Sequence, residues 1–363
     1  MIVGSTKEDL TLEKRVSLTP ETAKNIIGLG LQVCIEKDYA SHLGIQDNEY
    51  KKAGVEIKTS SNEVFNSSKA IIKVNCPSEN EISILKDNTI LIGMFNPSKN
   101  KSQIDKIINK KINIFSLELL PRITRAQSMD VLSSQSNLAG YRAVVDCVSE
   151  FEKAVPMMMT AAGTVPAAKI LVIGAGVAGL QAIATAKRIG AIVSATDVRL
   201  TAKEQVESLG GKFLTVEGSE NLETKGGYAK EASEDFKKKQ TEMLATAASK
   251  SDIIICTALI PGKQAPRIIT ENIIKNMKPG SVIFDLAVLH GGNSAYSEID
   301  KTISINGIKI IGLSNIMNKL PLTASNLYAK NIFSFVRNLY SREKKSFVIN
   351  MEDEIIKNTL LKE

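Results

Sequence analysis

The chain has 363 residues, of which 43% are hydrophobic and 23% charged, and its formal net charge is +7 at pH 7. This length suits two domains, and the apolar content is enough to build a hydrophobic core in each. The sequence has no Arg-rich patch and no patch of basic residues interleaved with aromatics, which argues against a nucleic-acid partner.

The cysteines and the hydropathy pattern bear on the redox compartment of the chain, on metal sites and on membrane insertion. Cys34, Cys76, Cys147 and Cys256 form no C-x-x-C pair and no Cys/His ligand spacing, which predicts a reducing compartment and no metal site. The N-terminus lacks the apolar segment of a signal peptide. Residues 155–193, the most apolar region, are interrupted by charges and glycines, so we expect no direct insertion into a membrane.

Short apolar runs alternate with helical patterns over the first 120 residues. Thr19, Pro20 and Glu21 have the order of an N-cap, a first-position proline and a first-turn acid, which predicts a helix ending at Gly28. This alternation predicts a parallel sheet with helices on both faces. The expected strands lie at residues 2–3, 32–36, 69–74, 89–94 and 112–116.

A long helical pattern over residues 128–153 leads from this first region into a second one. A connector rich in Met, Gly and Pro follows at residues 156–166. Beyond it we expect strands at 170–173, 192–196, 212–214, 252–256, 281–285 and 309–312, helices at 177–188 (ended by Gly190) and 270–277, and a helical segment over 315–338.

The expected fold class is therefore α/β, with two Rossmann-like, doubly wound parallel-sheet domains flanking a cleft. The first domain is discontinuous and consists of residues 1–130 and 316–363, because the last long helix is expected to return to it. The second domain spans residues 131–315.

The most informative stretch is Gly174-Ala175-Gly176-Val177-Ala178-Gly179, a G-x-G-x-x-G pattern between a predicted strand and a predicted helix. The first glycine permits a tight turn, the second lets the backbone approach a pyrophosphate, and the third lets the helix pack closely on the strand. The helix N-terminus adds N–H groups and a partial positive charge for phosphates. A turn that needs glycines only for packing is the alternative.

Asp197 follows the next predicted strand, about 20 residues beyond the glycine turn. Its carboxylate suits the two ribose hydroxyls of an adenosine and repels a 2′-phosphate, so the expected dinucleotide is NAD(H). Arg199 argues the other way, since a nearby arginine can favour a 2′-phosphate, but Asp197 occupies the discriminating position.

A second polar group surrounds the start of the long helix. Asp130 and Ser133 are three residues apart and share a helix face, and Arg122 is a candidate partner for Asp130. Gln127 offers both a donor and an acceptor, which suits a nicotinamide carboxamide. A capping cluster at a buried helix start is the alternative.

A third stretch, residues 225–230, is polar and glycine-hinged and carries Tyr228 as its aromatic residue. This composition suits a lid that closes over a ligand. A plain solvated loop is the alternative.

Four motifs resemble the NAD(H)-binding first domain of proton-translocating NAD(P) transhydrogenases, which is carried by their alpha subunits. The wider family includes the alanine dehydrogenases. The motifs are RAQSMDVLSSQSNLAGYRAV from Arg125, GAGVAGLQAIATAKRIGA from Gly174, DVR from Asp197 and TALIPG from Thr257. The first of them is highly specific, and the similarity extends over residues 1–340.

The resemblance implies that Arg122, Gln127, Asp130 and Ser133 contact the nicotinamide half of NADH and carry the catalysis. It also implies a mobile loop that closes on the nucleotide through Tyr228. The implied NAD(H) contacts besides Gln127 and Asp130 are Ser128, Met129, Gly174, Gly176, Val177, Gly179, Asp197, Val198, Arg199, Gly227, Tyr228, Thr257, Ala258 and Leu259.

The alanine dehydrogenases bind the substrate carboxylate and polarise its carbonyl with residues that match Arg15 and Lys73. They also need proton transfer, and here the sequence departs from them. Phe95-Asn96-Pro97 stands where they carry a histidine, and Leu289 stands where they carry an acid. His290 also departs from the polar pair expected in transhydrogenases; it is either a solvent-facing loop residue or a replacement contact.

Direct hydride transfer between two nicotinamides needs no general base, only close approach of the rings and exclusion of water. A site with Gln, Arg, Asp and Ser but no His suits that reaction. The chain offers no second G-x-G-x-x-G, so NADP(H) is expected on a partner subunit. An alanine dehydrogenase-like oxidoreductase and a non-catalytic NAD-binding module are the alternatives.

The resemblance further implies hydride transfer from NADH to NADP⁺ coupled to proton translocation, and activity only with partner subunits. Those partners are the membrane-embedded and NADP-binding transhydrogenase subunits. It implies a homodimer that is cytoplasmic and peripheral to the inner (cytoplasmic) membrane.

Overall fold

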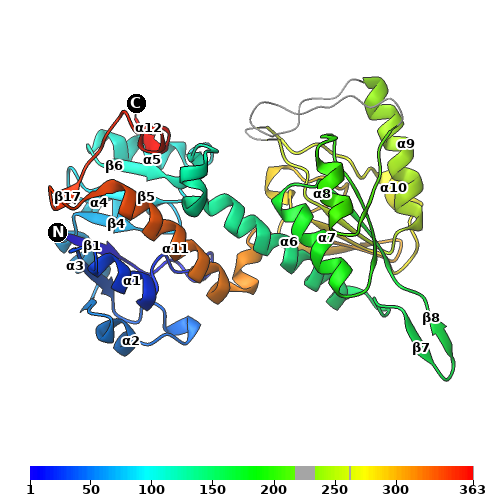
Figure 1. Cartoon of the computed structure of the whole chain (residues 1–363), viewed down its shortest axis with the longest axis horizontal. Coiled ribbons are helices and arrows are strands. Elements are labelled where there is room, and N and C mark those ends of the chain that lie inside the picture. Colours follow the sequence, from blue (N-terminus) through cyan, green and yellow to red (C-terminus); the bar gives the residue numbers. More distant parts are fainter. Residues whose placement is uncertain (217–233, 261–262, 363) are drawn as a thin grey trace. The chain divides into compact units, whose positions relative to one another are not determined.

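The computed structural model describes residues 1–216, 234–260 and 263–362. Contacts divide the chain into two compact units. Unit 1 contains Met1–Gln135 and Met317–Glu363, and unit 2 contains Ser136–Ile316 (Figure 1). The chain passes from one to the other within the long helix α6 (Val131–Glu150) and returns within the short 3-10 helix Ile316–Lys319. The predicted α/β class is confirmed.

Unit 1 contains a seven-stranded sheet in the order β18-β6-β5-β4-β1-β2-β3. All neighbouring strands are parallel except β18, which pairs antiparallel with β6. The strands are β1 (Ile2–Ser5), β2 (Gln32–Glu36), β3 (Glu56–Lys58), β4 (Ala70–Ile72), β5 (Ile90–Gly93), β6 (Asn113–Ser116) and β18 (Leu360–Leu361).

Helices cover both faces of this sheet, as the alternation of the sequence predicts. Ala70 and Ile72 point to the face covered by α1 (Pro20–Ile27) and α11 (Pro321–Leu339), which pack together. Ile71 points to the opposite face, which α3 (Ser61–Ser67), α4 (Glu79–Ile84) and α5 (Lys101–Asn109) cover. Two further helices, α2 (Asp47–Lys52) and α12 (Glu354–Thr359), and the short pair β16 (Tyr340–Ser341) and β17 (Ser346–Phe347) complete the unit.

Unit 2 contains a second seven-stranded sheet in the order β11-β10-β9-β12-β13-β15-β14. Only the edge strand β14 is antiparallel. The strands are β9 (Lys169–Ile173), β10 (Ile192–Thr196), β11 (Lys212–Phe213), β12 (Ile253–Cys256), β13 (Val282–Asp285), β14 (Lys301–Ile305) and β15 (Ile308–Gly312), and the helices beside α6 are α7 (Val177–Arg188), α8 (Ala202–Ser208), α9 (Glu234–Lys250) and α10 (Glu271–Lys275).

The register of unit 2 aligns the carboxyl ends of its central strands. Ile173 pairs with Thr196 on one side and with Cys256 on the other, and Cys256 pairs with Asp285. The chain leaves β9 toward β10 and later returns to the opposite side at β12, so β9 borders the point where the strand order reverses. Ligands of such sheets bind at this point, beyond the carboxyl ends.

Three predicted features differ from the structure. The connector at 156–166 is a hairpin of β7 (Met158–Thr160) and β8 (Gly163–Val165), which extends away from the unit 2 sheet (Figure 1). Its strands are largely exposed, so they lack the apolar alternation that reveals a strand. The long helix begins at Val131, after a 3-10 segment, and Ile189 rather than Gly190 is the C-cap of α7.

Candidate functional site

The glycine turn between β9 and α7 has the tight geometry that its sequence predicts. Gly174 has φ +91°, a conformation that favours glycine. A Cβ on Gly179 would lie 1.8 Å from the Gly174 carbonyl oxygen, so helix and strand approach too closely for any side chain there. Gly176 is the N-cap of α7, and a Cβ there would meet nothing within 4 Å. The amino end of α7 is therefore approachable at Gly176.

Asp197 lies at the end of β10 and binds both this turn and Arg199. Its Oδ2 accepts the backbone N–H of Ala175 at 2.7 Å and the Arg199 Nη2 at 2.8 Å. Its Oδ1 accepts the backbone N–H and the Nε of Arg199 at 2.8 and 2.9 Å. A carboxylate has about four acceptor positions, so a ribose that binds here must displace or share the Arg199 guanidinium. Val198 is half-buried between them.

The segment after β12 forms the third part of this edge. The Thr257 hydroxyl donates to the carbonyl oxygens of Ile173 and Gly174, at 3.1 and 2.9 Å. A Cβ on Gly174 would lie 2.7 Å from the Thr257 Oγ1 and 3.2 Å from the Ala258 nitrogen. Leu259 is 44% exposed. The structure thus brings the glycine turn, Asp197 and Thr257–Leu259 together beyond the carboxyl ends of the adjacent strands β9, β10 and β12.

The candidate nicotinamide residues lie in unit 1. A 3-10 helix, Thr124–Met129, carries Gln127 and Ser128, which are exposed, and Met129, which is buried. Asp130 follows and accepts the backbone N–H of Ser133 at 2.9 Å and its hydroxyl at 2.6 Å. Asp130 therefore caps the amino end of α6. Arg122 is exposed.

Asn331 on α11 holds this segment in place. Its Nδ2 donates to the Ser128 carbonyl oxygen at 2.9 Å, and its Oδ1 accepts the Ser134 hydroxyl at 2.7 Å. Sequence reasoning missed this residue, because it lies about 200 positions away and nothing in its own helix pattern marks it. The two lid candidates, Gly227 and Tyr228, lie outside the described residues.

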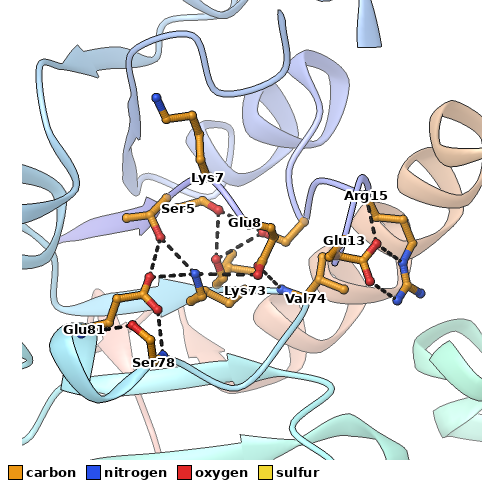
Figure 2. A network of polar contacts seen from close by, with 12 residues as sticks. Ser5, Lys7, Glu8, Glu13, Arg15, Lys73, Val74, Ser78 and Glu81 are labelled. Atoms are coloured by element: carbon orange, nitrogen blue, oxygen red, sulfur yellow. Dashed lines mark hydrogen bonds and ion pairs between the residues drawn. The ribbon is translucent and has the colours of Figure 1, made fainter. Parts of the chain in front are cut away.

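Arg15 is paired with a carboxylate of its own segment. Its Nε and Nη2 donate to the two carboxylate oxygens of Glu13 at 2.8 and 2.7 Å (Figure 2). Its Nη1 donates to the Gln135 Oε1 at 3.0 Å. The side chains of Arg15 and Glu13 are 9% and 1% exposed. The Arg15 guanidinium is therefore bound by side chains of unit 1.

Lys73 lies between two carboxylates, as Figure 2 shows. Its ammonium is 2.8 Å from Glu81 and 3.7 Å from Glu8, and it donates to the Thr6 hydroxyl at 3.2 Å. Burial by itself lowers the pKa of Lys73, but the charges of Glu8 and Glu81 outweigh it and raise that pKa. Burial raises the pKa of Glu8 despite the Lys73 charge and the bond from the Val74 N–H. Sequence reasoning found Lys73 but neither carboxylate.

At the two departures from alanine dehydrogenases, the side chains of Phe95, Asn96 and Leu289 cannot themselves transfer a proton. Phe95 is fully buried, and the backbone N–H groups of Phe95 and Asn96 donate to the Glu118 carboxylate. Leu289 is 48% exposed, and His290 is exposed beside it, as the solvent-facing interpretation predicts.

Neither a metal cluster nor a membrane span is found in the part of the chain that the structure describes. No group of three or more His, Cys, Asp or Glu side chains there is arranged to hold a metal ion. No helix among the described residues combines the length and the apolar character needed to cross a bilayer.

Comparison with known families identifies the class to which this fold and site belong. The chain matches the family model "Alanine dehydrogenase/PNT, N-terminal domain" over residues 4–139 and "Alanine dehydrogenase/PNT, C-terminal domain" over residues 143–363. The chain therefore belongs to the alanine dehydrogenase/PNT family, as the motifs predict.

Individual relatives narrow the similarity to one branch. The sequence is 47% identical to the first part of the NAD(P) transhydrogenase subunit alpha of Rhodospirillum rubrum, over 99% of this chain and 95% of the relative. It is 44% identical to the protein of the same name from Rickettsia prowazekii, over 99% and 94%. The structure of transhydrogenase from Sinorhizobium meliloti superimposes with a TM-score of 0.91 at 45% identity, over 100% of this chain and 98% of that one.

Proposed function

We propose that this chain is the NAD(H)-binding subunit of a proton-translocating NAD(P) transhydrogenase. It binds NADH and presents it for direct hydride transfer to NADP⁺ held by a partner subunit. The observation that carries the proposal is the glycine turn at Gly174–Gly179 with Asp197 on the adjoining strand end, in a chain 47% identical to a transhydrogenase alpha subunit.

The chemistry assigned to the residues of the chain is binding and orientation. The turn and the N-terminus of α7 take the pyrophosphate, and Asp197 takes the adenosine ribose. Gln127, with Arg122, Asp130 and Ser133, orients the nicotinamide carboxamide so that the ring faces its acceptor. Hydride transfer between two pyridine rings moves no proton, so the site needs no acid–base residue.

A self-contained amino-acid dehydrogenase is the second candidate, and the described contacts disfavour it. Such an enzyme needs cations for the substrate and a proton-transfer group. Here Arg15 is paired with Glu13, Lys73 lies between Glu8 and Glu81, and Leu289 is aliphatic. A non-catalytic NAD-responsive module is the third candidate and has no specific observation in its favour.

The decisive experiment compares the purified chain alone and with the NADP-binding and membrane-embedded subunits. Calorimetric titration measures NADH and NADPH binding, and absorbance follows hydride transfer from NADH to an NADP⁺ analogue. We expect binding of NADH by the chain alone and transfer only in the complex. Turnover of alanine or pyruvate by the chain alone would establish the dehydrogenase instead, and NADH binding without turnover in either format would favour the module.

We also propose that the chain is a homodimer that attaches to the cytoplasmic membrane through its partner subunits. The β7–β8 hairpin supports a self-association surface, because Met159 in β7 is 85% exposed and Met157, which precedes β7, is 66% exposed. Proton translocation is assigned to the membrane-embedded partner. Analytical ultracentrifugation of the purified chain measures the dimer directly, and a monomer at micromolar concentration would exclude it.

A further inference from the structure

Asn293 is a fully buried side chain whose hydrogen-bonding capacity is directed at one loop. Its Oδ1 accepts the backbone N–H of Ala258 at 3.0 Å. Its Nδ2 donates to the Ala258 carbonyl oxygen and to the Pro266 carbonyl oxygen, both at 2.9 Å. The amide thus binds both backbone polar groups of Ala258, as a neighbouring strand would. It also links Ala258 to Pro266, because the same side chain binds both residues.

The position of Ala258 matters because the glycine turn packs directly against it. A Cβ on Gly174 would lie 3.2 Å from the Ala258 nitrogen, and the preceding Thr257 donates to the Gly174 carbonyl oxygen. Packing this close leaves little room for the Ala258 peptide to shift without displacing the turn. The conformation of the turn and that of the loop are therefore coupled through Ala258.

Asn293 is itself held by the end of the neighbouring strand β13. The buried Asp285 accepts the backbone N–H of Ser294 at 2.9 Å, and the Asn293 carbonyl oxygen accepts the N–H groups of Ile268 and Ile269 at 2.8 and 2.9 Å. Three hydrogen-bonded links, joined through residues adjacent in sequence, thus connect β13 to the glycine turn. Asp285 binds the N–H of Ser294, the residue after Asn293. Asn293 binds Ala258, and Thr257, the residue before Ala258, binds the Gly174 carbonyl oxygen. Each member lies in unit 2.

We propose that Asn293 is a positioning residue for nucleotide binding: it fixes the Ala258 peptide so that Thr257–Leu259 forms a rigid wall beside the phosphate-binding turn. The inference rests on the proposed function, because it presumes that this sheet edge binds NADH. An asparagine is required rather than a carboxylate or an aliphatic residue, since one acceptor and two donors must be supplied from one planar group.

The test is Asn293→Asp, which keeps the size and one acceptor but replaces the donating amide with an oxygen. At pH 8 the ionised carboxylate faces two carbonyl oxygens, so we expect the Kd for NADH, measured by titration, to rise about tenfold. At lower pH the protonated acid regains one O–H donor, so the difference from wild type should shrink to about threefold or less. Charged groups nearby, namely Asp285, Arg267 and His290, are present in both proteins, so the comparison at each pH removes their contribution.

Two control variants separate positioning from loss of stability. Asn276→Asp makes the same chemical change at the exposed end of α10, and Val282→Ala truncates a buried residue at the amino end of β13, away from the glycine turn. Both should bind NADH within about twofold of wild type at temperatures well below their Tm. Recovery of affinity at low pH by Asn293→Asp alone supports positioning.

An affinity of Asn293→Asp equal to wild type at pH 8, or a deficit that does not change with pH, overturns the inference. If Asn293→Asp does not fold, Asn293→Ser replaces it, because a serine offers one donor and one acceptor where the asparagine offers two donors and one acceptor. We expect weaker NADH binding by this variant, and an affinity equal to wild type overturns the inference. Failure of the wild-type chain to bind NADH would refute the proposed function itself, which is a separate result.

Discussion

Replacing Asp197 with asparagine removes the charge at the adenosine end of the proposed site while keeping the side chain's shape. In the structure the carboxylate accepts the Ala175 N–H and three donors of Arg199. The asparagine oxygen can still accept hydrogen bonds from these groups. Its NH2 group, however, would face N–H donors of Ala175 or Arg199 and could not bind them. The variant therefore weakens the attachment of Arg199 as well as the contact with a ribose.

The expected magnitude follows from an exchange of hydrogen bonds. Each hydrogen bond from a ribose hydroxyl to a carboxylate contributes about 1.5–3 kcal/mol. Asp197 must release or share the Arg199 guanidinium to make these bonds, which offsets part of the gain. We expect a net loss of about 1–3 kcal/mol, or a Kd for NADH raised about 5–150-fold.

Calorimetric titration of wild type and Asp197→Asn with NADH and with NADPH measures this change. The preference for NADH over NADPH should narrow, because the variant no longer repels a 2′-phosphate. Asp252→Asn is the matched control: this carboxylate lies at the opposite, amino end of the strands, where it accepts the Lys169 N–H and pairs with Lys278. An unchanged NADH affinity in Asp197→Asn, or an equal loss in Asp252→Asn, would refute the ribose assignment.

Three further predictions test other regions of the chain. Gln127→Asn should slow hydride transfer in the reconstituted complex at least about tenfold while changing NADH affinity less; equal rates remove Gln127 from the nicotinamide site. Gly179→Ala should lower the free energy of unfolding in urea by about 3 kcal/mol or more, because its Cβ would lie 1.8 Å from a carbonyl oxygen, whereas Gly176→Ala should change stability by less than about 1 kcal/mol and weaken NADH binding. Burial raises the pKa of Glu8, so near this pH the folded chain holds a proton that the unfolded chain releases. The free energy of unfolding should therefore fall as the pH rises above about 4.3, the ordinary pKa of a glutamate. Glu8→Gln should flatten this dependence of stability on pH, and an unaltered dependence contradicts the raised pKa of Glu8.

Local patterns in the sequence were enough to predict the strand, the glycine turn and the helix at the carboxyl end of the unit 2 sheet. The strand, glycine turn and helix at residues 169–188 depend on contacts between residues close in sequence, and glycines at Gly174 and Gly179 are dictated by the turn itself. The N-cap at Thr19 is equally local. Periodicity also located the central strands, because each is buried on both faces and appears as a short apolar run.

The hairpin at Met158–Val165 and the antiparallel edge strand β14 were not predicted, because these strands are not buried on both faces. Both are largely exposed, so their strands are decided by pairing with a neighbouring strand rather than by burial. The sequence likewise marked Lys73 and Arg15 as cations but not the carboxylates that neutralise them.

The sequence by itself determined the alternation of strands and helices, the tight glycine turn and the acidic residue at the next strand end, since all of these follow from local spacing. Only the tertiary structure decided how the candidate residues are supported. Asn293 reaches Ala258, Asn331 reaches Ser128, and Lys73 reaches Glu8 across tens to hundreds of residues. Such contacts depend on which strands become neighbours in the folded sheets, and no periodicity within one segment carries that information.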